Sequence, residues 1–354
     1  MLSCLPTVSA CSSLESSDYD CLVLVSPDVS KAKVSSAVTA SITSLAEVDS
    51  KALTSVSVCP VALPCKRLVY SPTGPLDRDY DDVRRFSDAA TAGMKRALAA
   101  GAKKPLLMVD GSLPGQKGEE AALAGLLGAL AAVYVPLEIR DLGDARSAKV
   151  ASLGWAGDQG VIDEALAIET GRVVCRDIGG SDPERTAAPR VEQYVRDYFK
   201  GSRVKVEVVQ GQETFEKEYP CLAAVNRCAA HVDRHDGRVI WLTYEPEDGK
   251  FERTLYMVGK GITYDTGGAD IKAGGIMVIL FSRNYLLNCS LSQAGMSRDK
   301  CGAAAAAGVM ATVTKLQPRG VKVVAAMAMV RNSVGSDAYV ADEIITSRAG
   351  VRLR

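Results

Sequence analysis

The chain has 354 residues, of which 47% are apolar and 24% are charged, as is typical of a soluble globular protein of about two domains. Its 42 lysines and arginines balance 42 aspartates and glutamates. This neutral balance gives no electrostatic argument for binding nucleic acid or an anionic membrane.

The first half of the chain alternates strands with helices. Buried strands are predicted at 20–26, 67–71 and 105–111, and helices at 79–102 and 119–132. Such alternation predicts an α/β domain in which helices cover a sheet, and we expect it to span residues 1–177. The longest apolar run, 121–137, is rich in alanine and glycine and contains Pro136. A buried helix that leads into a strand is therefore expected there, and not a membrane span.

A second α/β domain is predicted over residues 178–354. Its boundary is placed at 178–185, where two glycines precede Asp182 and Pro183. These two residues are typical of the start of a helix, and helical sequence continues to Gly201. Strands are then predicted at 204–209, 238–244, 253–259 and 321–330, with a small-residue helix at 301–317. The sheet is expected to be largely parallel.

Cysteines and histidines do not form a recognisable zinc pattern. Ten cysteines are scattered without a CxxC pair, beside only two histidines, and reduced thiols in a cytoplasmic protein are expected. The first twenty residues lack the basic and apolar regions of a secretory signal. His231 and His235 have no HExxH glutamate and are expected on an exposed helix end. Cys301 is expected to be a small buried residue that opens a helix.

Charges and glycines are concentrated in VGKGITYDTGGADIKAGGIM, Val258–Met277. The preceding strand is expected to end at Lys260, and ligands of α/β sheets gather at such ends. Asp265 offers a carboxylate for a divalent cation, and Lys260 beside a cation can lose its proton and become a ligand. Lys272 can stay charged and stabilise an oxyanion. An ordinary surface turn at Gly-Lys-Gly is the alternative, which spacing alone favours slightly.

Three segments resemble one family in the correct order. VGKGITYDTGGADIK is similar to the signature of the leucyl aminopeptidase (cytosol aminopeptidase) family of dinuclear metallopeptidases. SRDKCGAAAAAG resembles its second metal-binding segment, and VRNSVGSDAYVADEIITSRAG resembles the stretch before its third signature. The resemblance covers about residues 178–354. It implies an incomplete C-terminal α/β metallopeptidase domain that follows an N-terminal macro-like α/β domain.

The resemblance also implies roles for individual residues. Lys260, Asp265 and Asp299 correspond to metal ligands, Lys272 to the catalytic lysine that polarises the scissile carbonyl, and Met296 to the substrate-binding pocket. Two divalent ions (zinc, manganese or magnesium) would bridge the attacking water. The implied partners are peptide substrates and copies of the same chain, usually in a hexamer, with no nucleic acid and no membrane.

Two departures from the family pattern affect the expected activity. Asp299 follows Lys260 by 39 residues, against 23 in the family, and removing Val278–Gln293 restores the shorter spacing. We interpret this segment as a translated intron, with a natural loop insertion as the alternative. The third family signature, Asn-Thr-Asp-Ala-Glu-Gly-Arg, is expected shortly after the sequence stops at Arg354. It supplies two further metal ligands and the arginine that holds a bicarbonate.

Two functions of different kinds follow from these observations. The first is metal-dependent removal of N-terminal residues of the leucine type by two-metal hydrolysis, impaired here because three of five family ligands are present. The alternative is a catalytically inactive, truncated relative that acts only through assembly with other subunits. Nucleotide binding by the first domain has no Walker or Rossmann fingerprint to support it.

Overall fold

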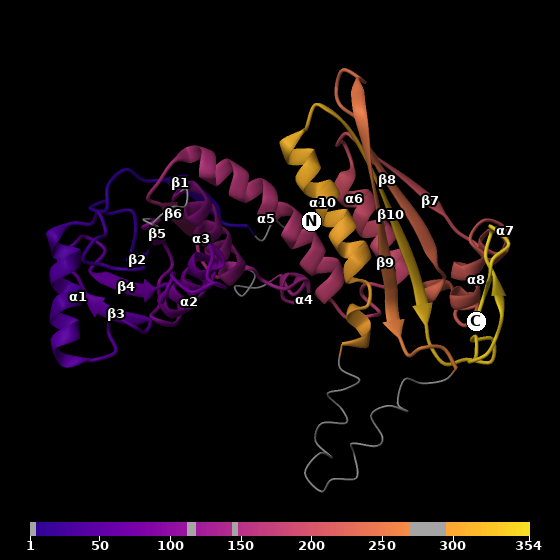
Figure 1. Cartoon of the computed structure of the whole chain (residues 1–354), viewed down its shortest axis with the longest axis horizontal. Coiled ribbons are helices and arrows are strands. Elements are labelled where there is room, and N and C mark those ends of the chain that lie inside the picture. Colours follow the sequence, from indigo (N-terminus) through magenta and orange to yellow (C-terminus); the bar gives the residue numbers. More distant parts are fainter. Residues whose placement is uncertain (1–4, 112–117, 144–147, 270–294) are drawn as a thin grey trace, which may run out of the picture. The chain divides into compact units, whose positions relative to one another are not determined.

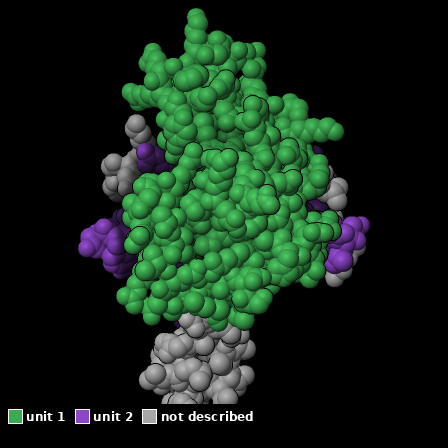
Figure 2. All heavy atoms as spheres, turned by 90° about the vertical axis from the view of Figure 1, so that its right-hand side faces the viewer, with its two compact units in different colours: residues 1, 170–354 green, residues 2–169 purple. Residues whose placement is uncertain are grey.

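The computed structural model describes residues 5–111, 118–143, 148–269 and 295–354. The chain forms two compact units, residues 2–169 and residues 170–354 (Figures 1 and 2). The division falls inside helix α5 (Gln159–Gly180), and the predicted boundary after residue 177 lies in the last turn of the same helix. The first half of α5 contributes Ile162 to the core of one unit, and its second half contributes Val174 to the core of the other.

The first unit is built on a six-stranded sheet with the order β1-β6-β5-β2-β4-β3. Its strands are β1 (Thr7–Ala10), β2 (Cys21–Ser26), β3 (Ser57–Pro60), β4 (Arg67–Pro72), β5 (Pro105–Val109) and β6 (Ser152–Trp155). All neighbours are parallel except β3, which pairs antiparallel with β4. The three strands predicted from the sequence are β2, β4 and β5, and they form the middle of this sheet.

Helices cover both faces of the six-stranded sheet. The helices of this unit are α1 (Ser36–Val48), α2 (Arg84–Ala99), α3 (Gly118–Val133) and α4 (Leu137–Arg140). Along β2, Leu22 and Leu24 pack with α1, whereas Val23 and Val25 pack with α2 and α3, because successive strand residues face opposite sides. The strand predicted after α3 is wrong, since Pro136 precedes the short helix α4, a position that suits proline.

The second unit contains a four-stranded sheet with the order β7-β8-β10-β9. The strands are β7 (Val204–Val209), β8 (Arg238–Tyr244), β9 (Phe251–Asp265) and β10 (Gly320–Asn332), and a small sheet pairs β11 (Ile345–Thr346) with β12 (Arg352–Leu353). Only β9 and β10 are parallel in the larger sheet. The predicted largely parallel sheet is therefore wrong. The alternating pattern of β7 is the one that antiparallel strands with a half-exposed face show.

The four-stranded sheet is also covered on both faces. Its helices are α6 (Ala188–Phe199), α7 (Gln212–Glu218), α8 (Pro220–Asn226) and α10 (Cys301–Leu316), with single 3-10 turns η2 (Asp233–His235) and η4 (Met296–Arg298). Leu242 of β8 packs with α6, α10 and the end of α5, whereas Val239 packs with α7 and α8. No helix in the described ranges is both long and apolar enough to cross a bilayer.

The helix predicted to begin at Asp182 starts later. The carboxylate of Asp182 accepts hydrogen bonds from the backbone N–H groups of Glu184 at 3.1 Å and Arg185 at 2.9 Å, so it caps a turn. Helix α6 begins only at Ala188, with Pro189 in its first turn. The local signal for a cap was correct, but Asx turns and helix starts use the same side-chain geometry.

Candidate metal centre

Strand β9 runs through the predicted site instead of ending before it. It continues to Asp265 because its pairing with β10 persists, with Lys260 opposite Ala328 and Asp265 opposite Asn332. The prediction that the strand ends at Lys260 is wrong, and so is the surface turn that was the alternative for Gly-Lys-Gly. Gly259 lies within this continuous strand, where its role is in packing against α10.

Glycines allow the start of α10 to contact the backbone of β9. A Cβ atom added at Gly259 would lie 2.4 Å from the Cα of Ala303, and one added at Gly302 would lie 2.9 Å from the backbone N of Lys260. Such distances are far below van der Waals contact, so no side chain fits at either position. The backbone N–H of Ile262 also donates to the carbonyl of Asp299 at 3.2 Å. These contacts bring the turn that carries Asp299 next to Lys260.

Three predicted metal ligands therefore meet. The Nζ atom of Lys260 lies 3.1 Å from Oδ2 of Asp265 and 3.0 Å from Oδ2 of Asp299. The side chain of Asp265 is only 6% exposed, whereas those of Lys260 and Asp299 are 56% and 41% exposed. The site thus has one buried carboxylate at its base, and its other two groups are open to solvent.

Asp265 is held by a partner that the sequence did not reveal. Its Oδ1 accepts hydrogen bonds from Nδ2 of Asn332 at 2.9 Å and from the backbone N–H of Gly267 at 3.0 Å. Asn332 is itself buried, at the end of β10. The only sequence signal for it is a polar residue directly after a buried apolar strand. Its distance from Asp265 depends on the register between β9 and β10.

The chemistry of these groups fits a divalent cation. Two carboxylates are hard oxygen donors, and an amine becomes a third donor when it is deprotonated. Burial disfavours the charged form of Lys260, but the hydrogen bonds that its amine donates to Asp299 and Asp265 outweigh that effect and raise its pKa. The site therefore already stabilises one positive charge between its carboxylates. Among the described residues, no group of three His, Cys, Asp or Glu side chains could hold a metal. The amine of Lys260 is the third group that the structure places beside the two carboxylates.

Of the other predicted site residues, Met296 lies within the described part of the chain and Lys272 lies outside it. Met296 lies in η4, three residues before Asp299, and is partly buried. Lys272 and the segment Val278–Gln293 lie outside the described residues.

Cys301 opens α10 as predicted, but it is exposed and not buried. The helix start at which it lies contacts β9 through Gly302 and Ala303 instead.

The two histidines are not on a helix end of the kind predicted. His231 is exposed in a turn, but His235 ends η2 with a side chain only 10% exposed. Its Nε2 lies 2.6 Å from Oε1 of Glu184, and Arg234 lies 3.3 Å from the other oxygen of that carboxylate. The hydrogen bond with His235, assisted by Arg234, lowers the pKa of Glu184. His235 therefore takes part in a cluster of charged side chains with Glu184 and Arg234.

This cluster predicts a pH-dependent contribution to stability. Because the folded-state pKa of Glu184 is lowered, its contribution is present above the ordinary value of 4.5 and is lost as the pH falls through the lower folded value. We expect Glu184→Gln to reduce the free energy of unfolding at pH 7 by less than about 1 kcal/mol, since the carboxylate is more than half exposed. The difference measured by urea unfolding should be smaller at pH 3 than at pH 7. An equal difference at both pH values would contradict this assignment.

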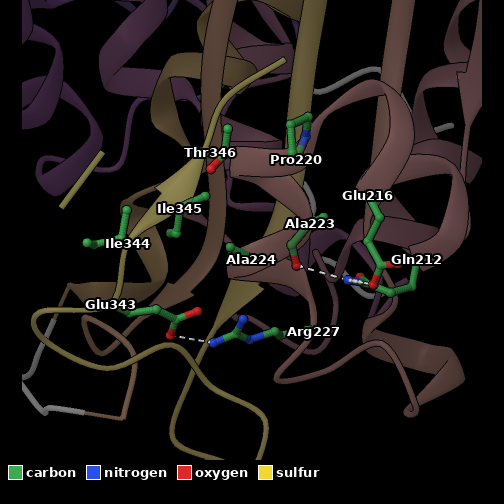
Figure 3. Close-up of a pocket in the computed structure, with 10 residues that line it drawn as sticks. All are labelled: Gln212, Glu216, Pro220, Ala223, Ala224, Arg227, Glu343, Ile344, Ile345 and Thr346. Carbon is green, nitrogen blue, oxygen red and sulfur yellow. Dashed lines mark hydrogen bonds and ion pairs between the residues drawn. The ribbon is translucent and has the colours of Figure 1, made fainter. Parts of the chain in front are cut away.

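A pocket elsewhere in the second unit has a volume of about 250 Å³ (Figure 3). Its lining residues are Gln212, Glu216, Pro220, Ala223, Ala224, Arg227, Glu343, Ile344, Ile345 and Thr346, and none of them was predicted as a site residue. Nη2 of Arg227 lies 2.6 Å from Oε2 of Glu343, and this pairing lowers the pKa of Glu343. These two charges neutralise one another, whereas Glu216, the other charged lining residue, accepts a hydrogen bond from the amide of Gln212 at 3.1 Å. The separation of Arg227 and Glu343 by 116 residues explains why no local motif revealed them.

The amino-acid sequence is similar to those of proteins named as aminopeptidases. A Caenorhabditis elegans protein named as an aminopeptidase is 41% identical over 88% of this chain and 55% of its own length. A Helicobacter hepaticus protein named as a cytosol aminopeptidase is 25% identical over 70% of this chain and 48% of its own length. The chain therefore spans about half the length of these relatives.

Solved structures share the fold. The bottromycin maturation enzyme BotP, in complex with Mn, superposes with a TM-score of 0.72 at 21% identity, over 94% of this chain and 64% of that chain. A mutant of tomato leucine aminopeptidase gives a TM-score of 0.70 at 14% identity, over 98% and 67%. Residues 173–354 match the model of the cytosol aminopeptidase family, catalytic domain, and this segment contains all three converging residues. The chain belongs to the cytosol aminopeptidase family.

Proposed function

We propose that the chain carries part of the catalytic centre of a metal-dependent aminopeptidase, which removes leucine-type N-terminal residues from peptides by two-metal hydrolysis. The observation that carries this proposal is the meeting of Lys260, Asp265 and Asp299, whose carboxylates both lie within 3.1 Å of the lysine amine. These three residues would hold divalent ions of zinc, manganese or magnesium. When bound, such ions activate water and neutralise negative charge at the scissile carbonyl.

The remaining residues of the proposal act on the substrate. Lys272 would donate a hydrogen bond to the scissile carbonyl and stabilise the negative charge that develops on its oxygen. Met296 would contact the side chain of the first residue of the peptide. Asn332 would keep Asp265 oriented, as residues behind metal ligands commonly do. The protein would lie in the cytoplasm, as the names of its relatives imply for those proteins.

The chain of 354 residues is expected to bind ions weakly and to hydrolyse peptides slowly when purified alone. Three donors converge among the described residues, whereas two ions that share a water need more protein ligands than this. In the family resemblance, an aspartate, a glutamate and a bicarbonate-holding arginine complete the centre. Normal turnover of a leucine amide by the purified chain would contradict this expectation.

The test of the proposed site is Asp299→Asn, which keeps the size of the side chain and removes its charge. We expect Mn²⁺ affinity, measured by calorimetry, to fall by at least about a hundredfold. Loss of a direct metal ligand should weaken binding more than changes to the residues behind the ligands usually do. Any hydrolysis of leucine amide should fall with it. Asp342→Asn is the matched control, because the ion pair that the structure describes for Asp342 is with the exposed Arg354, at 2.6 Å. Equal Mn²⁺ affinity in both variants would overturn the proposed site.

A second candidate function is assembly without catalysis, and the free edge of β9 supports it. Within the described part of the chain, β9 is the last strand of its sheet, and its neighbour there is β10. Along it, Leu255, Tyr256 and Val258 are 51%, 68% and 79% exposed. Exposed apolar edge strands are templates for pairing with another chain. Light scattering separates the candidates: an oligomer without Mn²⁺-dependent hydrolysis supports assembly, and a monomer that hydrolyses leucine amide supports the enzyme.

A further inference from the structure

Lys300 is a fully buried lysine directly beside the candidate metal centre. It follows Asp299 in the chain, precedes the first residue of α10, and has no solvent-exposed surface. Burial of an amine is unfavourable unless hydrogen bonds replace its water. An apolar side chain could fill the same space without this penalty, so the function of the amine should be sought in the groups to which it donates.

The amine of Lys300 joins two segments that are far apart in the sequence. Its Nζ donates to the carbonyl of Ser181 at 3.0 Å and to the carbonyl of Ser297. Ser181 directly follows the last residue of α5, where helix carbonyls lack partners within the helix and a basic group is favoured. Ser297 lies in η4, within the short turn that ends at Asp299. The buried amine therefore ties this turn to the end of α5.

The position of Asp299 depends on the same turn. Its carbonyl accepts the N–H of Ile262 at 3.2 Å, and its carboxylate reaches Lys260 at 3.0 Å. Its own side chain is 41% exposed, and Lys260 is the side-chain partner that the structure records for it. Asp265, by contrast, is held by Asn332 and by the backbone of Gly267. The position of the Asp299 carboxylate therefore depends on the contacts that hold residues 295–300 against β9.

We propose that Lys300 is a positioning residue, whose two hydrogen bonds to Ser181 and Ser297 hold the turn that places the Asp299 carboxylate beside Lys260 and Asp265. The part of this inference that concerns metal affinity rests on the proposed function. The part that concerns the turn does not, because it can be measured without a metal.

The test is Lys300→Met, which keeps the length and apolar stem of the side chain but removes its donors. The N–H of Ile262 should exchange with deuterium about tenfold faster or more, because its acceptor is the Asp299 carbonyl. The N–H of Ile240, in the buried middle of β8, should keep its protection. Mn²⁺ affinity, measured by EPR titration, should fall about tenfold or more. Lys315→Met, at an exposed position in the last turn of α10, is the matched control and should change none of these values.

The outcomes separate three cases. Unchanged exchange at Ile262 overturns the inference, and so does equal acceleration at Ile262 and Ile240, which would mean that Lys300 only stabilises the whole unit. If Ile262 alone accelerates but the unsubstituted chain binds no Mn²⁺, the inference about the turn is supported and the proposed function fails. If Lys300→Met does not fold, Lys300→Gln is the second variant, because its amide keeps a donor group on a shorter side chain. Deuterium exchange at the Ile262 N–H should then speed up by a smaller factor. Exchange at the rate of the unsubstituted chain in that variant would overturn the inference.

Discussion

Replacing Asp265 by alanine should abolish Mn²⁺ binding and lower the free energy of unfolding by about 3 kcal/mol. The carboxylate accepts from Lys260, from Asn332 and from the backbone of Gly267, at distances between 2.9 and 3.1 Å. Its removal takes away the carboxylate to which the buried amide of Asn332 donates. Buried donors that lose a charged acceptor are among the most destabilising changes in a folded protein. Urea unfolding and Mn²⁺ calorimetry measure the two effects.

Asp265→Asn separates the loss of charge from the loss of hydrogen bonds. Its amide oxygen can still accept from Gly267 and Asn332, so most of the stability should return, while Mn²⁺ affinity stays low because one negative charge is gone. If Asp265→Ala unfolds at the same urea concentration as the unsubstituted chain, Asp265 is not the buried base of the site that its 6% exposure indicates.

Strands whose residues are all apolar were the easiest part of the fold to predict. CLVLVS of β2 is buried at every position, and its sequence alone indicates a central strand. The short edge strand β1 was missed, because TVSA is polar and mostly exposed. Helix α1 was missed too, since its serines and threonines lower its helix propensity and only two of its residues are buried.

The candidate centre was predicted where its residues lie in recognisable motifs and missed where they do not. Lys260 and Asp265 were identified from their residue types and Asp299 through resemblance to the family, and the structure brings these three together. Asn332 was missed because its contact with Asp265 spans 67 residues and exists only in the observed register of β9 on β10. The packing role of Gly259 could not be predicted for a related reason: a glycine in a sequence does not show which helix will pack against it.

Gly259→Ala should therefore be among the most damaging small substitutions in the second unit. The new Cβ atom would lie 2.4 Å from Cα of Ala303 and 2.5 Å from both N of Ala303 and O of Gly302. All three are backbone atoms, so no side-chain rotation relieves the collision, and α10 must move away from β9. We expect the free energy of unfolding to fall by about 3 kcal/mol, at the upper end of the usual range for overpacking. Mn²⁺ affinity should fall as well, because Asp299 moves with the start of α10.

Two further variants make this prediction specific. Gly180→Ala is the matched control, because a Cβ atom there meets nothing within 4 Å and the backbone is not in the left-handed region, so stability should stay within about 0.5 kcal/mol of the unsubstituted chain. Gly259→Ala combined with Ala303→Gly should remain as unstable as Gly259→Ala alone, since removing the methyl of Ala303 leaves its backbone in place. Recovery of stability in the double variant would show that side chains set the spacing between α10 and β9. In that case, the backbone contact between Gly259 and Ala303 would not be what fixes the position of Asp299.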